Sequence, residues 1–203
     1  MKIIMLMGAS GTGKTSIANE LAAMADPWVV VPSVVRPIAK DFDIASVDDM
    51  LAKPVAVRLD FQRAIAEAYV QQAERYLRGP YPRLVFERSP WCHIINGTVA
   101  ISYPDAVDFS PECTEWVPEQ LWRLIKETSR AVIGHVVGRP EWVPDNFRSE
   151  SQLFNDRIIK STADFARRLP NVVCRVGYEN RNGPLSPKDR ANHLLKALRL
   201  FSS

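Results

Sequence analysis

The stretch Ile3-Ile4-Met5-Leu6-Met7-Gly8-Ala9-Ser10-Gly11-Thr12-Gly13-Lys14-Thr15 near the start of the chain decides the fold. Residues 3–7 form an apolar run, which is typical of a strand buried on both faces of a parallel sheet. Residues 8–15 match the pattern G-x-x-x-x-G-K-[ST], and apolar residues recur at helical spacing at Ile17, Leu21 and Met24. The sequence therefore predicts a strand, a glycine-rich turn and a helix in immediate succession.

The turn at residues 8–15 has the composition of a phosphate-binding loop. Its glycines let backbone N–H groups approach and wrap an anion, and the helix N-terminus adds a favourable partial positive charge. Lys14 is expected to reach the β- and γ-phosphates of ATP, and Thr15 to place its hydroxyl on Mg²⁺. The predicted nucleotide-binding residues are Gly8, Ala9, Ser10, Gly11, Thr12, Gly13, Lys14 and Thr15.

Apolar runs and helical patterns alternate along the rest of the chain. Further strands are expected at residues 28–31, 84–86, 131–137 and 172–176, and helices at 55–78, from about 91, at 118–127, at 149–169 and from 186 onward. This alternation predicts an α/β fold of three layers, with about five parallel strands flanked by helices. A length of 203 residues suits one domain spanning 1–203, with ligands bound beyond the carboxyl ends of the strands.

Composition excludes several classes of protein. A net charge of +3 is too small for the dense basic patch of a dedicated nucleic-acid binder. Cys92, Cys113 and Cys174 are widely spaced, so they indicate neither a disulfide framework nor a CxxC metal site and favour a reduced, cytoplasmic setting. The N-terminal apolar run is too short for a signal peptide, and no run is long enough to cross a membrane.

Charged residues follow the predicted strand at 84–86 directly. Glu87 can bind Mg²⁺ through water or accept a proton from an acceptor hydroxyl, and Arg88 can neutralise charge on a transferring phosphoryl group. These roles place Glu87 and Arg88 among the candidate catalytic residues, together with Lys14. The alternative is a structural Glu–Arg pair that caps the strand.

A second candidate anion contact follows the strand at 28–31. Pro37 favours extended geometry for the residue before it, Arg36, which is then expected to stand across from the glycine-rich loop. A guanidinium there can hold a phosphate by paired hydrogen bonds. A surface arginine on a loop is the alternative.

With these residues assigned, residues 1 to about 91 resemble the deoxynucleoside kinase and thymidylate kinase families of P-loop proteins, with a weaker echo at 139–158. Phe86-Glu87-Arg88-Ser89 is similar to the Glu-Arg-Ser motif of deoxynucleoside kinases, which implies that Glu87 works near Mg²⁺ and that Arg88 contacts the acceptor and the phosphates. Phe61-Gln62 is similar to a phenylalanine–glutamine pair whose glutamine hydrogen-bonds the acceptor base. Core packing for Phe61 and an exposed helix position for Gln62 are the alternatives.

One position departs from the deoxynucleoside kinase pattern. Those kinases carry a glutamate base in a Val-Val-Pro-Glu context, whereas here Ser33 follows Val30-Val31-Pro32. A serine cannot act as that base at neutral pH without help, so an acceptor that is already anionic, such as a nucleoside monophosphate, is favoured. Arg36-Pro37 also resembles the acceptor-phosphate arginine of thymidylate and guanylate kinases. The resemblance thus implies transfer of the ATP γ-phosphate to a deoxynucleotide or deoxynucleoside, with Ser33 and Arg36 at the acceptor.

Two other functions stay open. Phages encode thymidylate-kinase-like enzymes that phosphorylate 5-hydroxymethyluracil within DNA. For such an enzyme, which would work in the host cytoplasm, tryptophans including Trp91, Trp116 and Trp142 could stack on bases, and Arg36 could hold a backbone phosphate. Asp60 or Glu87 would then supply the missing base. A P-loop NTPase without an acceptor is the third function, disfavoured because no hydrophobic strand ending in Asp is evident.

The segment 138–150 is predicted to form a lid. In the related kinases a lid after the fourth strand brings arginines over the transferring phosphate, which implies a catalytic role for Arg148 and a substrate contact for Arg139. Closure would exclude water and prevent wasteful ATP hydrolysis. Solvated loop charges are the alternative for both arginines, and Ser149 is a candidate N-cap for the helix that follows. A homodimer is left open.

Overall fold

The computed structural model describes residues 1–105, 114–137, 151–169, 173–177, 179–180 and 183–201. The strands are β1 (Lys2–Met7), β2 (Val29–Val31), β3 (Arg83–Phe86), β4 (Val132–Val136), β5 (Val173–Val176), β6 (Glu179–Asn180) and β7 (Gly183–Pro184). The helices are α1 (Lys14–Ala22), α2 (Val35–Asp41), α3 (Val47–Ala52), α4 (Val55–Leu77), α5 (Pro90–Ser102), α6 (Glu119–Glu127), α7 (Gln152–Ala166) and α8 (Pro187–Phe201).

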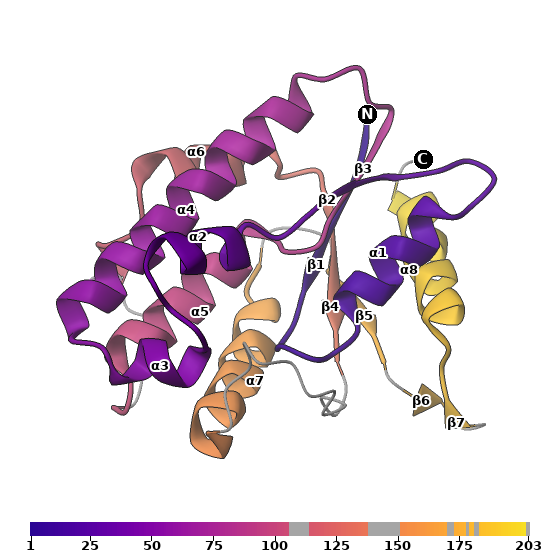
Figure 1. The fold of residues 1–203 in the computed structure, drawn as a ribbon. Coiled ribbons are helices and arrows are strands. Elements are labelled where there is room, and N and C mark those ends of the chain that lie inside the picture. Colours follow the sequence, from indigo (N-terminus) through magenta and orange to yellow (C-terminus); the bar gives the residue numbers. More distant parts are fainter. Residues whose placement is uncertain (106–113, 138–150, 170–172, 178, 181–182, 202–203) are drawn as a thin grey trace.

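A parallel sheet runs through the middle of the molecule (Figure 1). Over the described residues its five strands follow the order β2-β3-β1-β4-β5. Strand β1 is central, pairing Ile3 with Leu84 of β3 and Met5 with Ile133 of β4. Because these pairings are all parallel, the carboxyl ends of the strands meet at one edge of the sheet. The predicted α/β class with parallel strands is confirmed.

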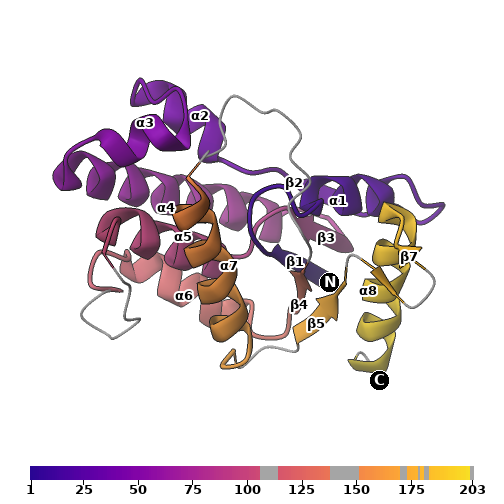
Figure 2. The same ribbon diagram turned by 90° about the horizontal axis from the view of Figure 1, so that it is seen from below.

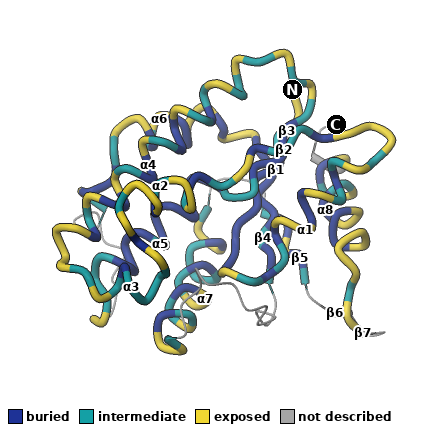
Figure 3. The backbone as a smooth tube through the Cα atoms, in the orientation of Figure 1, coloured by how far each residue is buried: buried dark blue, intermediate teal, exposed yellow. Residues whose placement is uncertain are grey.

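Helices cover both faces of the sheet, as the view along the layers shows (Figure 2). Helices α1 and α8 lie on one face, where Ile4 and Leu6 of β1 pack in one apolar cluster. Helices α4, α5 and α7 lie on the other face, where Met5 and Met7 join a larger cluster. Alternate residues of β1 thus enter opposite layers, which is why residues 3–7 of this strand are all apolar. Most residues of β1, β3 and β4 are buried (Figure 3).

Two local predictions are corrected by the structure. Arg36 was expected in extended geometry, but it lies in the first turn of helix α2 together with Pro37. Proline is accepted there because first-turn N–H groups have no partner within the helix. The second correction concerns α7, which begins at Gln152 and not at 149. Its N-cap is Ser151, whose hydroxyl accepts a hydrogen bond from the Phe154 N–H at 3.2 Å.

Helices α4 and α5 are tied together by a buried arginine. Arg58 of α4 is 6 % exposed, and its Nη1 donates to the carbonyl oxygens of Ala100 at 2.6 Å and Tyr103 at 2.8 Å. These carbonyls belong to the C-terminal end of α5, where the helix leaves acceptors without intrahelical donors and where a positive charge is favoured. Arg58 therefore caps one helix from another.

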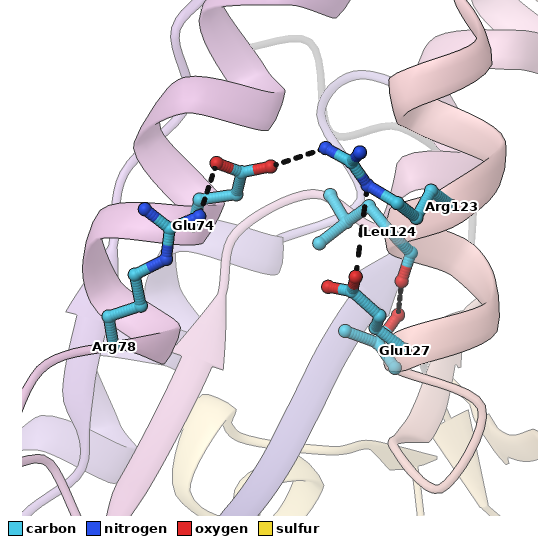
Figure 4. A network of polar contacts seen from close by, with 6 residues as sticks. Glu74, Arg78, Arg123, Leu124 and Glu127 are labelled. Atoms are coloured by element: carbon cyan, nitrogen blue, oxygen red, sulfur yellow. Dashed lines mark hydrogen bonds and ion pairs between the residues drawn. The ribbon is translucent and has the colours of Figure 1, made fainter.

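A surface network joins α4 to α6 (Figure 4). The Glu74 carboxylate contacts Arg78 at 3.0 Å and Arg123 at 3.2 Å, and Arg123 also lies 3.8 Å from Glu127. The hollow lined by these residues and Leu77 has a volume of about 330 Å³. It lies where α4 leads toward the start of β3, so it belongs to the edge of the sheet opposite the carboxyl ends. Exposed pairs of this kind each contribute up to about 1 kcal/mol.

A buried histidine lies in the first turn of α5. The ring of His93 is 4 % exposed and lies 4.3 Å from the ring of Tyr69, measured between centroids. Burial, and then the positive charge of Arg88, lower the pKa of His93 from 6.5 to about 3. The imidazole is therefore neutral in the folded protein at physiological pH.

Among the described helices, none has both the length and the apolar character of a membrane span.

Replacing Arg58 with methionine should reduce the free energy of unfolding by about 2–4 kcal/mol, because the buried carbonyls at the end of α5 lose a charged donor. Urea denaturation followed by circular dichroism measures this change. Arg63→Met is the matched control, since Arg63 lies on the exposed face of the same helix. Equal stability of the two variants would contradict the capping role.

The stability of the protein should fall in acid partly through His93. The unfolded chain takes up a proton at His93 below about pH 6.5, whereas the folded chain does so only near pH 3, so stability is lost as pH falls through this window. Between pH 8 and pH 5 the wild type should lose about 2 kcal/mol more than His93→Gln, which does not titrate. Urea denaturation at each pH measures the difference. His193→Gln, at an exposed position, serves as control and should follow the wild type; parallel curves for wild type and His93→Gln would refute the assignment.

Candidate active site

The glycine-rich loop connects the central strand to α1 at the carboxyl edge of the sheet (Figure 1). Gly8 has a φ of +152°, and a Cβ there would lie 2.5 Å from the carbonyl oxygen of Val136 at the end of β4. Gly13, the residue before α1, has a φ of +85° in the left-handed region. Both positions therefore require glycine, one for a close approach of backbones and one for its conformation.

Lys14 is held inside this loop. Its side chain is 7 % exposed, and Nζ donates to the carbonyl oxygen of Gly8 at 2.9 Å and to that of Ala9. Thr12 is also buried, and its hydroxyl donates to the Ala9 carbonyl at 3.0 Å. The ammonium group is thus positioned by the backbone of the loop whose phosphate-binding role the sequence predicts. Thr15, by contrast, is exposed in the first turn of α1.

Glu87 joins the ends of two strands. Its carboxylate Oε2 accepts a hydrogen bond from the backbone N–H of Ser33 at 3.0 Å, and its own N–H donates to the Val31 carbonyl at 3.1 Å. The segment after β3 is also bonded to β1, because the Ser89 N–H donates to the carbonyl of Leu6 at 2.8 Å. Ser33 and Glu87, predicted from separate motifs, are therefore brought together beside the strand that leads into the glycine-rich loop.

Arg88 is half-buried and is held through its backbone. The Tyr69 hydroxyl donates to the Arg88 carbonyl at 3.0 Å, and this contact crosses from α4 to the segment between β3 and α5. Burial raises the pKa of Tyr69 well above its usual value, so the hydroxyl remains a donor. Ser89 then caps α5, accepting from the Cys92 N–H at 3.3 Å. Tyr69 carries no motif and was missed by the sequence predictions.

Gln62 lies in a buried cluster with Met50, Gly97 and Trp116. The side chain is 7 % exposed, and its Nε2 donates to the Met50 sulfur at 3.5 Å. A Cβ on Gly97 would lie 2.4 Å from the Trp116 ring and 3.3 Å from Gln62 Oε1, so Gly97 admits both side chains. A sulfur acceptor is weak, which leaves most of the hydrogen-bonding capacity of this amide for a stronger partner. The exposed helix position considered as the alternative for Gln62 is excluded.

Four further predicted substrate residues lie on helices α2, α4 and α5. Phe61 is 2 % exposed and packs against Phe42 with ring centroids 5.5 Å apart, which is the core packing considered as its alternative. Trp91 is 8 % exposed between Trp122 and Phe165, with centroid distances of 6.0 and 5.4 Å. Asp60 is exposed on α4. Arg36 is exposed on α2, and the predicted lid with Arg139 and Arg148 lies outside the described residues.

The donor atoms at this edge suit a magnesium ion bound with a nucleotide. The candidates are the Thr15 hydroxyl and the Glu87 carboxylate, which are oxygen ligands of the kind that Mg²⁺ prefers. Among the described residues, no group of three or more His, Cys, Asp or Glu side chains could hold a metal ion. In nucleotide sites Mg²⁺ generally takes its other ligands from phosphates and water.

Comparison with known proteins agrees with this geometry. A family model described as an AAA domain matches residues 3–181. The thymidylate kinase of Candida albicans has a TM-score of 0.62 at 16 % identity, with 99 % of this chain and 92 % of that chain covered. The thymidylate kinase of Ehrlichia chaffeensis has a TM-score of 0.61 at 14 % identity, with 98 % and 97 % covered.

A third solved structure, of NadR protein in complex with NR, has a TM-score of 0.54 at 18 % identity. It covers 98 % of this chain, which spans half of that protein. At these identities the likeness shows the fold, and among proteins of curated function no match is found. Because the family model covers most of the chain, this protein belongs to the AAA domain family.

Proposed function

We propose that this protein is an ATP- and Mg²⁺-dependent kinase that transfers the γ-phosphate to a deoxynucleotide or deoxynucleoside. One observation carries the proposal: the glycine-rich loop with its buried Lys14 lies at the same edge of the sheet as Glu87 and Ser33. An anion-binding loop facing a carboxylate is the arrangement that phosphoryl transfer requires. The fold, which is that of thymidylate kinases, supports the same reaction class.

In the proposed reaction the backbone N–H groups of residues 8–15 bind the triphosphate, and Lys14 neutralises charge on its β- and γ-phosphates. An acceptor oxygen forms a bond to the γ-phosphorus while the bond from that phosphorus to the β,γ-bridging oxygen breaks, which leaves ADP. A hydroxyl acceptor also releases a proton. Mg²⁺, held by the Thr15 hydroxyl and the Glu87 carboxylate, would supply further neutralisation of phosphate charge when bound.

Glu87 is the better supported of the two candidate proton acceptors. Its carboxylate lies at the carboxyl edge, tethered to the Ser33 N–H, whereas Asp60 lies on an exposed face of α4. A monophosphate acceptor is already anionic and needs no base, so Glu87 would then act on charge and position. Arg36, exposed at the start of α2, is the proposed contact for the acceptor phosphate, and Gln62 the proposed contact for its base.

Radiolabelled ATP incubated with separate acceptors tests the proposed function. We expect label on deoxynucleosides or their monophosphates and a loss of transfer of at least about 10²-fold in Lys14→Ala, since charge on the phosphates goes unneutralised. Lys2→Ala, at an exposed residue at the start of β1, is the control and should retain transfer.

The other outcomes of this assay refute the proposal. Label found only on DNA that contains 5-hydroxymethyluracil would identify a DNA kinase. The described tryptophans other than Trp122 are buried and so do not support base stacking in such an enzyme. Phosphate release without transfer to any acceptor would identify an NTPase.

Replacing Glu87 with glutamine should lower kcat by about 10²-fold or more, because the negative charge is lost while the amide oxygen can still accept from the Ser33 N–H. The KM for ATP should change little, since the loop itself is intact. Steady-state kinetics measure both constants. Glu67→Gln, on the exposed face of α4, is the matched control. An unchanged kcat in Glu87→Gln would exclude Glu87 from the reaction.

A further inference from the structure

A second charged residue reaches the glycine-rich loop from the far end of the chain. Arg190 of α8 is 4 % exposed, and its Nη2 donates to the carbonyl oxygen of Thr12 at 2.9 Å. A Cβ on Gly13 would lie 2.9 Å from Arg190 Nη1, so the guanidinium lies directly against the loop backbone. Helices α8 and α1 pack together on the same face of the sheet, which brings Arg190 to this position (Figure 2).

This contact fixes the orientation of one peptide group. In a trans peptide the carbonyl and the following N–H point in opposite directions. Because Arg190 holds the Thr12 carbonyl toward α8, the N–H of Gly13 points away from α8. Gly13 directly precedes α1 and belongs to the segment proposed to wrap the triphosphate. An N–H group that already has the orientation needed to bind an anion does not have to be ordered when the anion binds. The entropic cost of binding is then smaller and the affinity higher.

The guanidinium also brings a permanent charge. Arginine stays protonated at any physiological pH, and a charge that is shielded from water acts on its neighbours more strongly than an exposed one. Arg190 therefore places a positive charge behind the loop while its hydrogen bond fixes the loop backbone. Gly13 needs to be glycine for its left-handed backbone, and Arg190 fills the space that a side chain there would take. The loop and the Arg190 side chain therefore pack as one unit.

We propose that Arg190 is a positioning residue for nucleotide binding, which orients the Thr12–Gly13 peptide and supplies positive charge behind the triphosphate. This inference rests on the proposed ATP-binding role of the loop. It assigns to the last helix a part in substrate binding that no motif within that helix indicates.

The test compares Arg190→Lys, Arg190→Gln and Arg190→Met with the control Arg199→Met, a change at an exposed position of the same helix. Lysine keeps the charge, glutamine keeps a neutral donor, and methionine keeps neither. Titration calorimetry with a magnesium complex of a non-hydrolysable ATP analogue measures Kd, and steady-state kinetics give the KM of the acceptor. Thermal unfolding without ligand shows that each variant is folded.

We expect Kd for the analogue to rise at least about tenfold in Arg190→Met, with smaller rises in the lysine and glutamine variants and none in Arg199→Met. The acceptor KM should stay within about twofold of the wild-type value, because the proposed acceptor contacts, Arg36 and Gln62, are not part of this peptide. A merely structural role would lower the thermal midpoint and change both constants together. If Arg190→Met does not fold, the lysine and glutamine variants decide by the same comparison.

Two results overturn the inference. The first is an unchanged Kd in every folded Arg190 variant while the wild type binds the analogue. The second is an equal loss of affinity for analogue and acceptor. Failure of the wild type itself to bind the analogue would instead overturn the proposed function, so the two failures are distinguishable.

Discussion

The parallel pairing of β1 with β3 on one side and β4 on the other is the constraint on which the rest of the structure depends. It places the end of β1 between the ends of its neighbours, so the turn that follows is surrounded by backbone. Gly8 lies so close to the Val136 carbonyl that no side chain fits there. From β3, the Ser89 N–H bonds to the Leu6 carbonyl. The loop is thus built into the sheet, and its geometry follows from strand pairing.

Around this loop, several groups of the candidate site are held by hydrogen bonds to the backbone or from a neighbouring element. Lys14 is held by loop carbonyls, Glu87 by the Ser33 N–H, and the carbonyl of Arg88 by the Tyr69 hydroxyl. Such tethers cost conformational entropy during folding but leave less to be ordered when a ligand binds. Arg190 adds a tether from the opposite layer. Apart from Lys14, whose ammonium group has to turn from the loop carbonyls toward a bound phosphate, an edge assembled in this way can meet a charged ligand with little rearrangement.

The sequence predicted those parts of the fold that local patterns determine. Apolar runs identified the strands β1–β5, and the glycine motif located the loop, because both signals lie in contiguous residues. The short helices α2 and α3 were not predicted. Helix α2 contains Pro37 in its first turn, where proline is compatible with a helix but does not by itself indicate one. The likeness to kinase folds confirms the class, while the site roles of individual residues stay predictions.

Contacts between residues that are far apart in the sequence could not be predicted from local sequence patterns. The bond from Arg190 to Thr12 spans 178 positions, and the bond from Arg58 to Ala100 joins two helices. One signal for Arg190 does exist, since it lies four residues before Leu194 on the apolar stripe of α8, where a charge is unexpected. For Phe61 a family motif, and for Trp91 the ability of tryptophan to stack on bases, indicated a substrate contact. In the structure Phe61 packs against Phe42 and Trp91 against Trp122 and Phe165. Packing of this kind is decided by the tertiary structure.

A crystal structure with a non-hydrolysable ATP analogue and Mg²⁺ tests the central claim most directly. The account predicts electron density for the triphosphate against the backbone N–H groups of residues 8–15, with Lys14 turned from the loop carbonyls toward the phosphates and the metal beside Thr15. An analogue bound at another surface while this loop keeps its present contacts would contradict it.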